Sequence, residues 1–301
     1  MKRATLILGL ACGACGASSP SPATPGHPSP ASAASPASAA SASATPGAPD
    51  PALVAVLSGP ARTDKERARD AARHPAETLS FFGVRPDAHV VELWPGGGWY
   101  TAILGPYLRE RGLLAVTYFD AKGDPNSAAA KENAELLQDS VALLARLAAT
   151  PAAFDKVAHQ AISPPNVVLG PDGSADFVLT FRNIHNWIQA GYAAQVFQAA
   201  AHVLKSGGVL GVEEHRASRE LTLAEMNDSG YVSEAYVIKL AEAAGLKLEA
   251  RAEINANPRD TKDHPNGVWS LPPTYAGKDV DRDKFAAIGE SDRMTLRFRK
   301  P

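Results

Sequence analysis

The sequence predicts an α/β fold: a doubly wound, mainly parallel sheet of seven strands with helices on both faces. Apolar runs short enough for strands alternate along the chain with longer stretches of helical periodicity. Three consecutive glycines, Gly96 to Gly98, follow shortly after the first of these apolar runs. The chain closes with two strand-like runs, which predict an antiparallel pair at one edge of the sheet.

The predicted strands are apolar runs bounded by turn-forming residues such as Gly, Pro and Asp. In chain order they are His89 to Leu93, Leu113 to Phe119, Lys156 to Ile162, Asp176 to Phe181, Val209 to Glu213, Leu246 to Ile254 and Arg293 to Arg299. Their alternation with helices favours parallel pairing, because a parallel neighbour needs a crossover connection.

The predicted helices share apolar residues at every third or fourth position. In chain order they are Thr63 to Leu79, Trp99 to Arg109, Asn126 to Ala149, Tyr192 to Leu204 and Ser233 to Ala244. We expect the first helix to pack on the sheet edge and to end before Gly83. Glycine readily takes the left-handed conformation found at helix C-termini.

The N-terminal residues differ in composition from the rest of the chain. Residues 1–16 predict an export signal, with a basic start and an apolar stretch too short to span a bilayer. Cys12 and Cys15 each follow an alanine, which resembles the lipobox of bacterial lipoproteins; the alternative is a cleavable signal with incidental cysteines. Residues 17–50, rich in Ala, Ser and Pro, predict a disordered linker, and residues 51–301 a single folded domain.

This organisation predicts an exported protein, either periplasmic or anchored to a membrane as a lipoprotein, with no membrane contact except that lipid anchor. The net charge is -2 at pH 7 and basic residues are scattered, so we expect no nucleic-acid partner. The domain has no cysteine and can form neither a disulfide nor a thiolate zinc site. The expected partner is a small-molecule substrate.

The glycine turn follows the first predicted strand in the pattern Glu92-x-x-Pro95-Gly96-Gly97-Gly98. In a Rossmann-like sheet, ligands bind beyond the carboxyl ends of the strands, where glycines let the backbone approach a cofactor closely. By itself this turn is equally compatible with a dinucleotide-binding enzyme. Further signals are therefore needed to choose between cofactors.

The turn resembles motif I of class I S-adenosylmethionine-dependent methyltransferases, Glu/Asp-x-Gly-x-Gly-x-Gly, except that Trp94 replaces the first glycine. Asp120 ends the second strand, where these enzymes place an acid. Residues Phe181 to Trp187 are similar to the Phe-x-Leu-Arg-Asn-Val segment of quinone C-methyltransferases. Residues Leu204 to Leu210 are similar to the Leu-Lys-Pro-Gly-Gly turn of the same superfamily.

More narrowly, residues 90–101 resemble a family of exported bacterial predicted methyltransferases marked by Glu-[Ile/Leu]-Trp-Pro-Gly-Gly-Gly-Trp-Tyr-Thr. Residues 271–273 and 288–296 match the Leu-Pro-Pro and Ile-Gly-Glu-Ser-Asp-Arg-Met-Thr-Leu segments of that family. The resemblance implies the class I methyltransferase fold and S-adenosyl-L-methionine as cofactor. It leaves the acceptor unidentified.

Carried over to this sequence, the resemblance implies a set of cofactor-binding residues at the carboxyl ends of the strands. They are Glu92, Trp94, Pro95, Gly96, Gly98, Tyr100, Thr101, Asp120 and Asn183. Glu92 would accept a hydrogen bond from the cofactor's amino group, and Asp120 would bind the ribose hydroxyls. Simpler roles stay open: either carboxylate can cap a helix, and Trp94 and Tyr100 can be packing residues.

His185 and His215 are the candidate catalytic residues, because an imidazole can take the proton of a hydroxyl or acidic-carbon acceptor near neutral pH. They could also be ordinary solvated histidines. We expect no metal site: Glu214, His215, His185 and the pair Asp263-His264 are usable ligands, but no tight spacing joins them. Residues 257–273 are expected to form a long loop over the pocket.

Taken together, these observations predict S-adenosylmethionine-dependent methyl transfer to an unidentified, small-molecule acceptor. One alternative is an exported, non-catalytic binding protein that keeps this fold, because the charged cofactor is made in the cytosol. A second alternative is an NAD-dependent oxidoreductase. Residues 96–98 lack the Gly-x-Gly-x-x-Gly spacing of that class.

Overall fold

A computed structural model describes residues 48–120 and 134–301 of the chain. The predicted signal, almost all of the predicted linker and the first residues of the predicted helix at 126–149 lie outside the described residues. Within the described ranges, no helix combines the length and apolar character needed to cross a bilayer.

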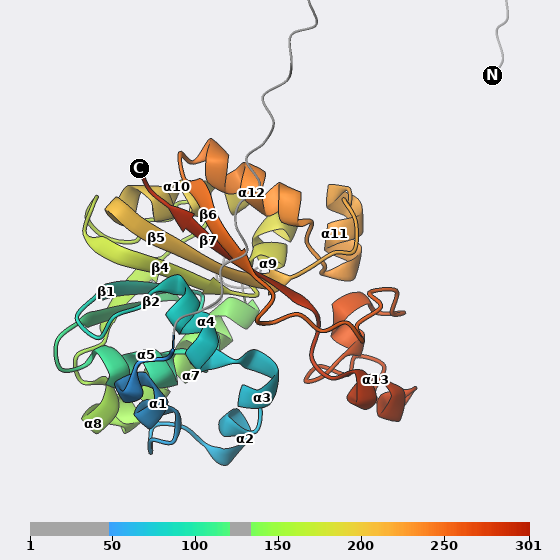
Figure 1. The fold of residues 1–301 in the computed structure, drawn as a ribbon, viewed down its shortest axis with the longest axis horizontal. Helices are drawn as coiled ribbons and strands as arrows, with labels where there is room; N and C mark the ends of the chain where they lie inside the picture. The colour runs from blue at the N-terminus through green and yellow to red at the C-terminus, as the bar shows by residue number, and fades with distance from the viewer. Residues whose placement is uncertain (1–47, 121–133) are drawn as a thin grey trace, which may run out of the picture. The chain divides into compact units, whose positions relative to one another are not determined.

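The predicted α/β fold class is confirmed, because the strands form one seven-stranded sheet in the order β3-β2-β1-β4-β5-β7-β6 (Figure 1). Strands β1 to β5 pair in parallel, and β7 pairs antiparallel with both β5 and β6. Their bounds are β1 His89–Leu93, β2 Leu113–Phe119, β3 Ala158–Ile162, β4 Ala175–Phe181, β5 Leu204–His215, β6 Lys247–Ala252 and β7 Arg293–Arg299.

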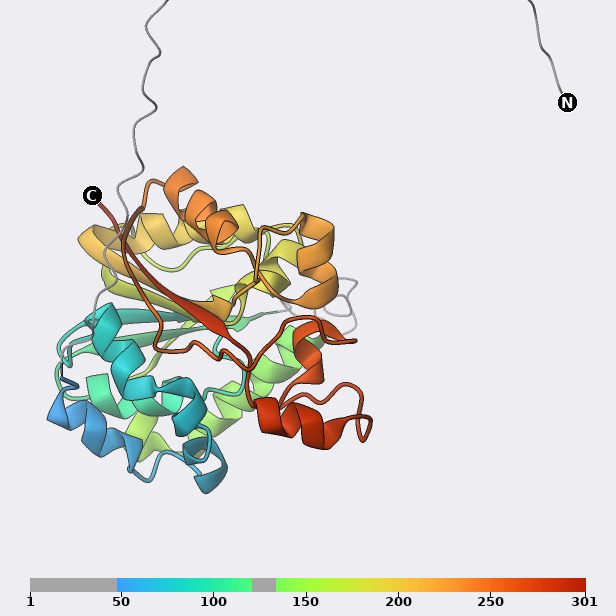
Figure 2. The same ribbon diagram turned by 45° about the vertical axis from the view of Figure 1, so that its right-hand side comes forward.

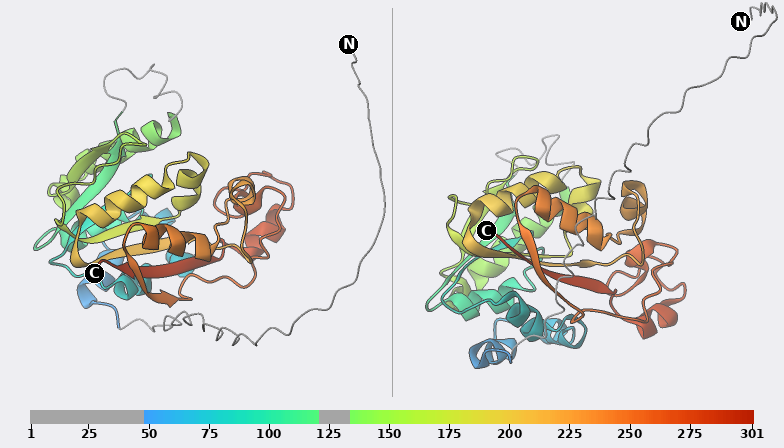
Figure 3. Two further views of the ribbon diagram at one scale, coloured as in Figure 1. Left: turned by 90° about the horizontal axis from the view of Figure 1, so that it is seen from above. Right: turned by 45° about the horizontal axis from the view of Figure 1, so that its top comes forward.

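Helices cover both faces of the sheet, as Figures 1 and 3 show. One face carries α1 Pro51–Leu57, α4 Pro75–Phe82, α5 Thr101–Leu108, α7 Ala134–Ala149 and α8 Pro151–Phe154. The other face carries α9 Ile184–Gln189, α10 Ala193–Val203 and α12 Glu234–Ala243. The remaining helices are α2 Asp64–Arg67, α3 Asp70–Arg73, α11 Leu223–Ser229, η1 Gly267–Ser270 and α13 Arg282–Ile288.

The strands divide the hydrophobic core in two, one half on each face. Neighbouring strand residues point to opposite faces, so Val90 belongs to the core under α5 and Val91 to the core under α10, and both are fully buried. This burial of both faces explains why β1, β2 and β4 are mostly apolar, unlike the edge strand β3.

The prediction of a single helix over residues 63–79 is wrong. The chain there forms three short helices, α2, α3 and α4. His74 lies between α3 and α4 with a left-handed φ of 41°, and Pro75 follows it. The residue before a proline is disfavoured in the α-helical region, so the helix is interrupted there. The helix α4 ends at Gly83 with a φ of 83°, as the sequence predicts.

The strand order reverses between β1 and β4, since β2 and β3 lie to one side of β1 and β5 to the far side of β4. In open α/β sheets, such a reversal leaves a crevice beyond the carboxyl ends of the two strands. The residues that follow β1 and β4, Trp94 and Asn183 among them, are therefore placed at this crevice.

Candidate functional site

A hollow lies beyond the carboxyl ends of β1, β2 and β4, at the reversal in strand order. Its wall is both aromatic and polar. The lining residues are Trp94, Pro95, Gly96, Thr117, Tyr118, Phe119, Leu136, Asp139, Ser140, Leu143, Ile162, Asn183, Asn186, Ala190 and Tyr192. Such a wall suits a ligand that combines a flat ring with hydroxyl or charged groups.

The turn after β1 is left-handed at three positions, with φ of 44° at Trp94, 54° at Gly96 and 78° at Gly98. Glycine takes this conformation freely, whereas a residue with a Cβ pays about 1–2 kcal/mol for it. Trp94 thus keeps the backbone shape of the glycine it replaces. Its backbone N–H donates to Oγ1 of Thr117 over 2.8 Å, which fixes the start of the turn against β2.

The indole of Trp94 packs against the ring of Trp187 on α9 and that of Tyr192, which precedes α10. Its ring centroid lies 5.1 Å from that of Trp187 and 6.3 Å from that of Tyr192, to which it is nearly parallel. The buried Nε1 of Trp94 has no hydrogen-bond partner among the described residues. A buried donor without a partner is costly, and is typical of a position that a ligand or water completes.

The helix α7 packs over the glycine turn. A Cβ at Gly98 would lie 2.9 Å from Cδ1 of Leu143, so no larger residue fits there without a shift of that leucine. Arg146 donates from Nη1 to the carbonyl of Gly97 over 3.0 Å and to Oε1 of Glu66 over 2.6 Å. These contacts hold the turn in place from the helix side.

Glu92 is fully buried at the end of β1 but is not among the residues that line the hollow. Its Oε2 accepts a hydrogen bond of 2.7 Å from Oγ1 of Thr101, the first residue of α5. Burial raises the pKa of Glu92 to about 7, although the bond from Thr101 acts in the opposite direction. The observed contact joins the end of β1 to the first residue of α5; the cofactor role of Glu92 and Thr101 stays a prediction.

The structure does not bring Tyr100 to the hollow. Its ring stacks on Phe181 with centroids 3.5 Å apart, and its hydroxyl donates to Oε2 of Glu213 over 3.0 Å. Glu213 also lies 3.3 Å from Nη1 of Arg293. Tyr100 belongs to the core on the α5 side, whereas Trp94 belongs to the core on the other side. Nothing in its surroundings supports the predicted cofactor role.

Asn183 and Asp120 lie at strand ends, where the sequence predicts them. Asn183 lines the hollow, and its Nδ2 donates to the carbonyl of Leu93 over 3.0 Å. Asp120 follows β2 directly, and its N–H donates to the carbonyl of Ile162 over 3.2 Å. Asp120 adjoins the lining residue Phe119. Both side chains are positioned by pairing between parallel strands.

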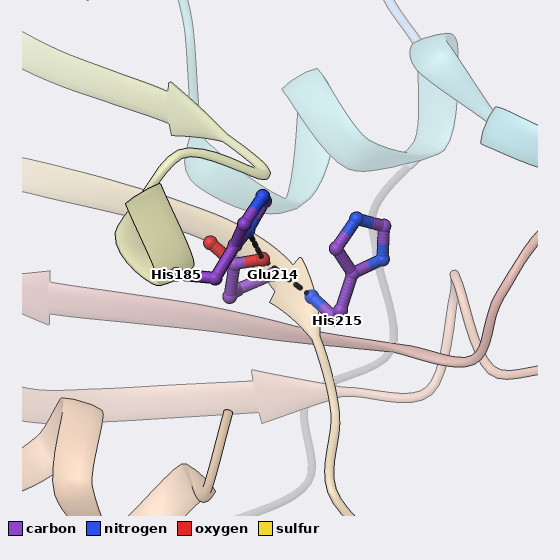
Figure 4. A group of neighbouring side chains, drawn as sticks. All are labelled: His185, Glu214 and His215. Carbon is purple, nitrogen blue, oxygen red and sulfur yellow. Dashed lines mark hydrogen bonds and ion pairs between the residues drawn. The ribbon is translucent and has the colours of Figure 1, made fainter. Parts of the chain in front are cut away.

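The two predicted catalytic histidines lie beside the buried carboxylate of Glu214, whose Oε1 is hydrogen-bonded to the ring of His185 and accepts from the backbone N–H of His215 (Figure 4). Nδ1 of His185 on α9 lies 3.0 Å from Oε1 of Glu214 at the end of β5. His215 follows on the strand, with its ring centroid 5.2 Å from that of His185 and its Nδ1 2.6 Å from Oγ of Ser291. Burial, the neighbouring His185 and the cation Arg182 hold the pKa of His215 well below its usual value.

Next to this group, arginines surround a single acid, Glu290. Arg69 and Arg73 donate to it over 2.7 and 3.0 Å, Arg293 donates over 3.0 Å, and Arg182 lies 3.7 Å away. Burial alone would raise the pKa of Glu290, but Arg73, Arg293 and Arg182 lower it to about 2. Burial and the nearby Arg182 lower the pKa of Arg73 to about 9. The cluster carries more positive than negative charge.

The loop predicted at 257–273 does not cover the hollow, because none of its residues is among the lining residues. Asp260 anchors it by accepting from the hydroxyl of Tyr231 over 2.9 Å and from Nε2 of His264 over 2.9 Å. Its Trp269 packs edge-on to His185, with centroids 6.2 Å apart. Figure 2 shows this C-terminal segment with α13 in front, next to the start of β7. The loop at 257–273 thus contacts the histidine group through Trp269 and does not line the hollow.

Sequence reasoning found four of the lining residues: Trp94, Pro95, Gly96 and Asn183. It missed the wall that α7 supplies, which includes Asp139 and Ser140. It also missed Asn186 and Tyr192. The amphipathic pattern of α7 predicts a helix but does not tell which end of the sheet its inner face reaches. Asn186, three residues after Asn183, is one turn further along α9 and could have been inferred.

Comparison with known proteins bears on the fold. A [4+2]-cyclase, SpnF, is 17% identical and aligns over 83% of this chain and 92% of its own, with a TM-score of 0.50. A SAM-dependent methyltransferase from Aquifex aeolicus is 17% identical over 68% of this chain and 93% of its own, with a TM-score of 0.47. The seven-stranded, Rossmann-like α/β fold is shared with the solved structure that reaches a TM-score of 0.50.

No protein-family model matches the chain, and no curated protein matches it. At these identities the solved structures show the fold alone. The one at a TM-score of 0.50 is named for a cyclisation instead of a methyl transfer. The activity must therefore be argued from the site.

Proposed function

We propose that the chain binds S-adenosylmethionine in the hollow at the ends of β1, β2 and β4 and transfers its methyl group to a small-molecule acceptor. The observation that carries this proposal is the left-handed turn from Trp94 to Gly98 at the reversal in strand order. There the backbone after β1 is open to a ligand while α7 fixes its shape.

The residues of the hollow fit the cofactor's chemistry. Aromatic rings at Trp94, Phe119 and Tyr192 can hold a flat adenine or face a cationic group. The carboxylate of Asp120 would accept hydrogen bonds from ribose hydroxyls, and the buried Nε1 of Trp94 is a donor in need of an acceptor. The cofactor supplies a methyl group already activated on a sulfonium.

Since the donor is activated, the protein's work is to position the acceptor and to exclude water. Asn183 lines the hollow and precedes His185 of α9 by two residues, and Glu214 and His215 are the last two residues of β5. Trp269 packs edge-on against His185 at that end of the site. The acceptor would therefore contact the two histidines while the cofactor lies against the turn.

Two measurements separate the three hypotheses: the thermal stability of the protein with each ligand, and methyl transfer in cell-envelope extracts. Purified protein is heated with S-adenosylmethionine, with S-adenosylhomocysteine and with NAD, because only a ligand bound by the native state raises the Tm. The enzyme proposal expects a rise with both sulfur compounds and none with NAD. A rise with NAD alone favours the oxidoreductase. Binding of the sulfur compounds without methyl transfer to any component of cell-envelope extracts favours the non-catalytic protein.

We also propose that the protein is exported and held at a membrane through its N-terminal cysteines. Support comes from the basic and apolar start of the chain and from the lipobox-like positions of Cys12 and Cys15. Fractionation of cells after labelling with a radioactive fatty acid tests this. Label in the membrane fraction that disappears in Cys12→Ser or Cys15→Ser identifies the anchor, and label absent from the wild type rejects it.

A further inference from the structure

We propose that His185, Glu214 and His215 form a binding site for one divalent transition-metal ion. One ligand atom from each of the three side chains lies within 4.8 Å of the others. They come from two adjacent parallel strands, His185 just after β4 and the other two at the end of β5, so the sheet itself brings them together (Figure 4). The role of the ion rests on the proposed methyl transfer, but its binding does not.

The distances suit coordination. Nδ1 of His185 and Oε1 of Glu214 are 3.0 Å apart. Two ligands that meet an ion at right angles, with bonds of about 2.1 Å, lie about 3.0 Å from each other. The ion would replace the proton that now joins these atoms. The ligand atom of His215 lies within 4.8 Å of the other two.

Hydrogen bonds from outside the group hold the ligands in position. Oγ of Ser291 lies 2.6 Å from Nδ1 of His215, which leaves Nε2 of that ring for the ion. Oε2 of Glu214 accepts from the N–H of Ile184 over 2.6 Å. Ser291 and Glu214 are both buried, at 3% and 0% exposure. Such outer contacts are typical of metal-binding histidines and carboxylates.

The donor set indicates the class of metal. Two imidazoles and one carboxylate suit Zn²⁺, Fe²⁺, Mn²⁺ or Co²⁺ better than Mg²⁺ or Ca²⁺, which prefer oxygen ligands alone. Three protein ligands leave a coordination position open, as in catalytic sites. An acceptor oxygen bound there would lose its proton more readily, and the histidines would act through the ion instead of as free bases.

The nearby arginines should lower the affinity of the site for a metal cation. Arg182 and Arg293 are close enough to His215 to disfavour a further positive charge, and Glu290 only partly offsets them. We therefore expect weaker zinc binding than in a structural zinc site. The same positive charge would attract an acceptor that carries an anionic oxygen toward the ion.

Zinc titration of the purified full-length chain, stripped of metal by a chelator, tests the site. We expect one Zn²⁺ per chain, with affinity at least tenfold lower in His185→Gln, His215→Gln and Glu214→Gln. The control is His202→Gln, since His202 is exposed on α10 and forms an ion pair with the exposed Asp172. Circular dichroism and thermal unfolding verify that each variant is folded.

The outcomes separate this proposal from the proposed function. No zinc binding by the wild type, or equal binding by the wild type and all three site variants, overturns the metal site. An equal loss in His202→Gln also overturns it. S-adenosylmethionine is titrated into the same samples, and its binding reports on the proposed function whatever the zinc result.

Discussion

The hydroxyl of Tyr100 donates a hydrogen bond of 3.0 Å to Oε2 of Glu213, and both residues are buried at 2% and 0% exposure. Tyr100 therefore holds a carboxylate of β5 instead of a ligand in the hollow. Tyr100→Phe removes a donor to a buried charge, which should destabilise the fold by about 1–3 kcal/mol. Urea unfolding measures this loss. The affinity for S-adenosylmethionine should stay within about twofold, and a tenfold loss would return Tyr100 to the cofactor site.

Glu92 makes the stability of the protein depend on pH. Its pKa is raised to about 7 in the folded state from 4.5, so the folded protein keeps the proton to higher pH than the unfolded chain. The stabilising contribution of protonated Glu92 to the free energy of unfolding is fully present below about pH 4.5 and is lost as the pH rises to about 7. The loss is about 3 kcal/mol.

Glu92→Gln should therefore be about as stable as the wild type at pH 4 and more stable at pH 8, provided that the amide keeps the bond from Thr101. Unfolding in urea across this pH range tests the prediction, with the exposed Glu77→Gln as control. Parallel pH profiles for Glu92→Gln and the wild type would show that Glu92 is not the group that titrates.

Glu290 stabilises the arginine cluster because it is the acid that Arg69, Arg73 and Arg293 share. Glu290→Gln removes the anion shared by Arg69 and the buried Arg73 and leaves Arg293 paired with Glu213, which should cost about 3–5 kcal/mol near neutral pH. The pKa of Glu290 is lowered to about 2, so its contribution is present above about pH 4.5 and is lost as the pH falls toward 2. Asp155→Asn, which breaks an exposed pair with Arg109, serves as the control. Equal stability of the two variants would contradict the account.

Trp94 has an unfavourable left-handed backbone but favourable ring packing. The free energies of these two effects decide whether replacing Trp94 stabilises or destabilises the fold. Trp94→Gly relieves a left-handed φ at a gain of about 1–2 kcal/mol. It also removes an indole packed on Trp187 and Tyr192, at a cost of about 3–5 kcal/mol. We expect a net loss of roughly 2–3 kcal/mol in urea unfolding. A variant more stable than the wild type would mean that the packing contributes little.

The backbone at Gly96 is the part of the turn that a ligand would approach most closely. Gly96 and Gly173 are both left-handed, with φ of 54° and 65°, and a Cβ at either has no close neighbour. Alanine at either position should therefore cost a similar 1 kcal/mol or so in stability. Only Gly96→Ala lies in the hollow and should weaken S-adenosylmethionine binding about tenfold, or 1.4 kcal/mol. Equal affinities of the two variants would remove the turn from the binding site.

Strands were the part of the fold that the sequence predicts best. The strands at residues 113–119 and 293–299 end where the pattern places them, because each is an apolar run bounded by turn-forming residues. Helices that are interrupted by a break are predicted less well from the sequence. The pattern at 63–79 has helical periodicity throughout, but the local restriction before Pro75 overrides it.

The site was predictable where it depends on strand ends and unpredictable where it depends on tertiary contacts. Trp94 and Asn183 follow strands directly, so the fold class alone places them at the hollow. His185 and Glu214 are 29 positions apart, and only the pairing of β4 with β5 brings them within 3.0 Å. Tyr100 lies outside the hollow, and its position in the turn does not reveal which face its ring takes.

Calorimetric titration of S-adenosylmethionine into the purified protein tests the central claim most directly. The account predicts saturable heat with one site per chain, reduced in Gly96→Ala and preserved in Gly173→Ala. Absence of binding heat for both S-adenosylmethionine and S-adenosylhomocysteine at millimolar concentrations, with the protein folded, would contradict it.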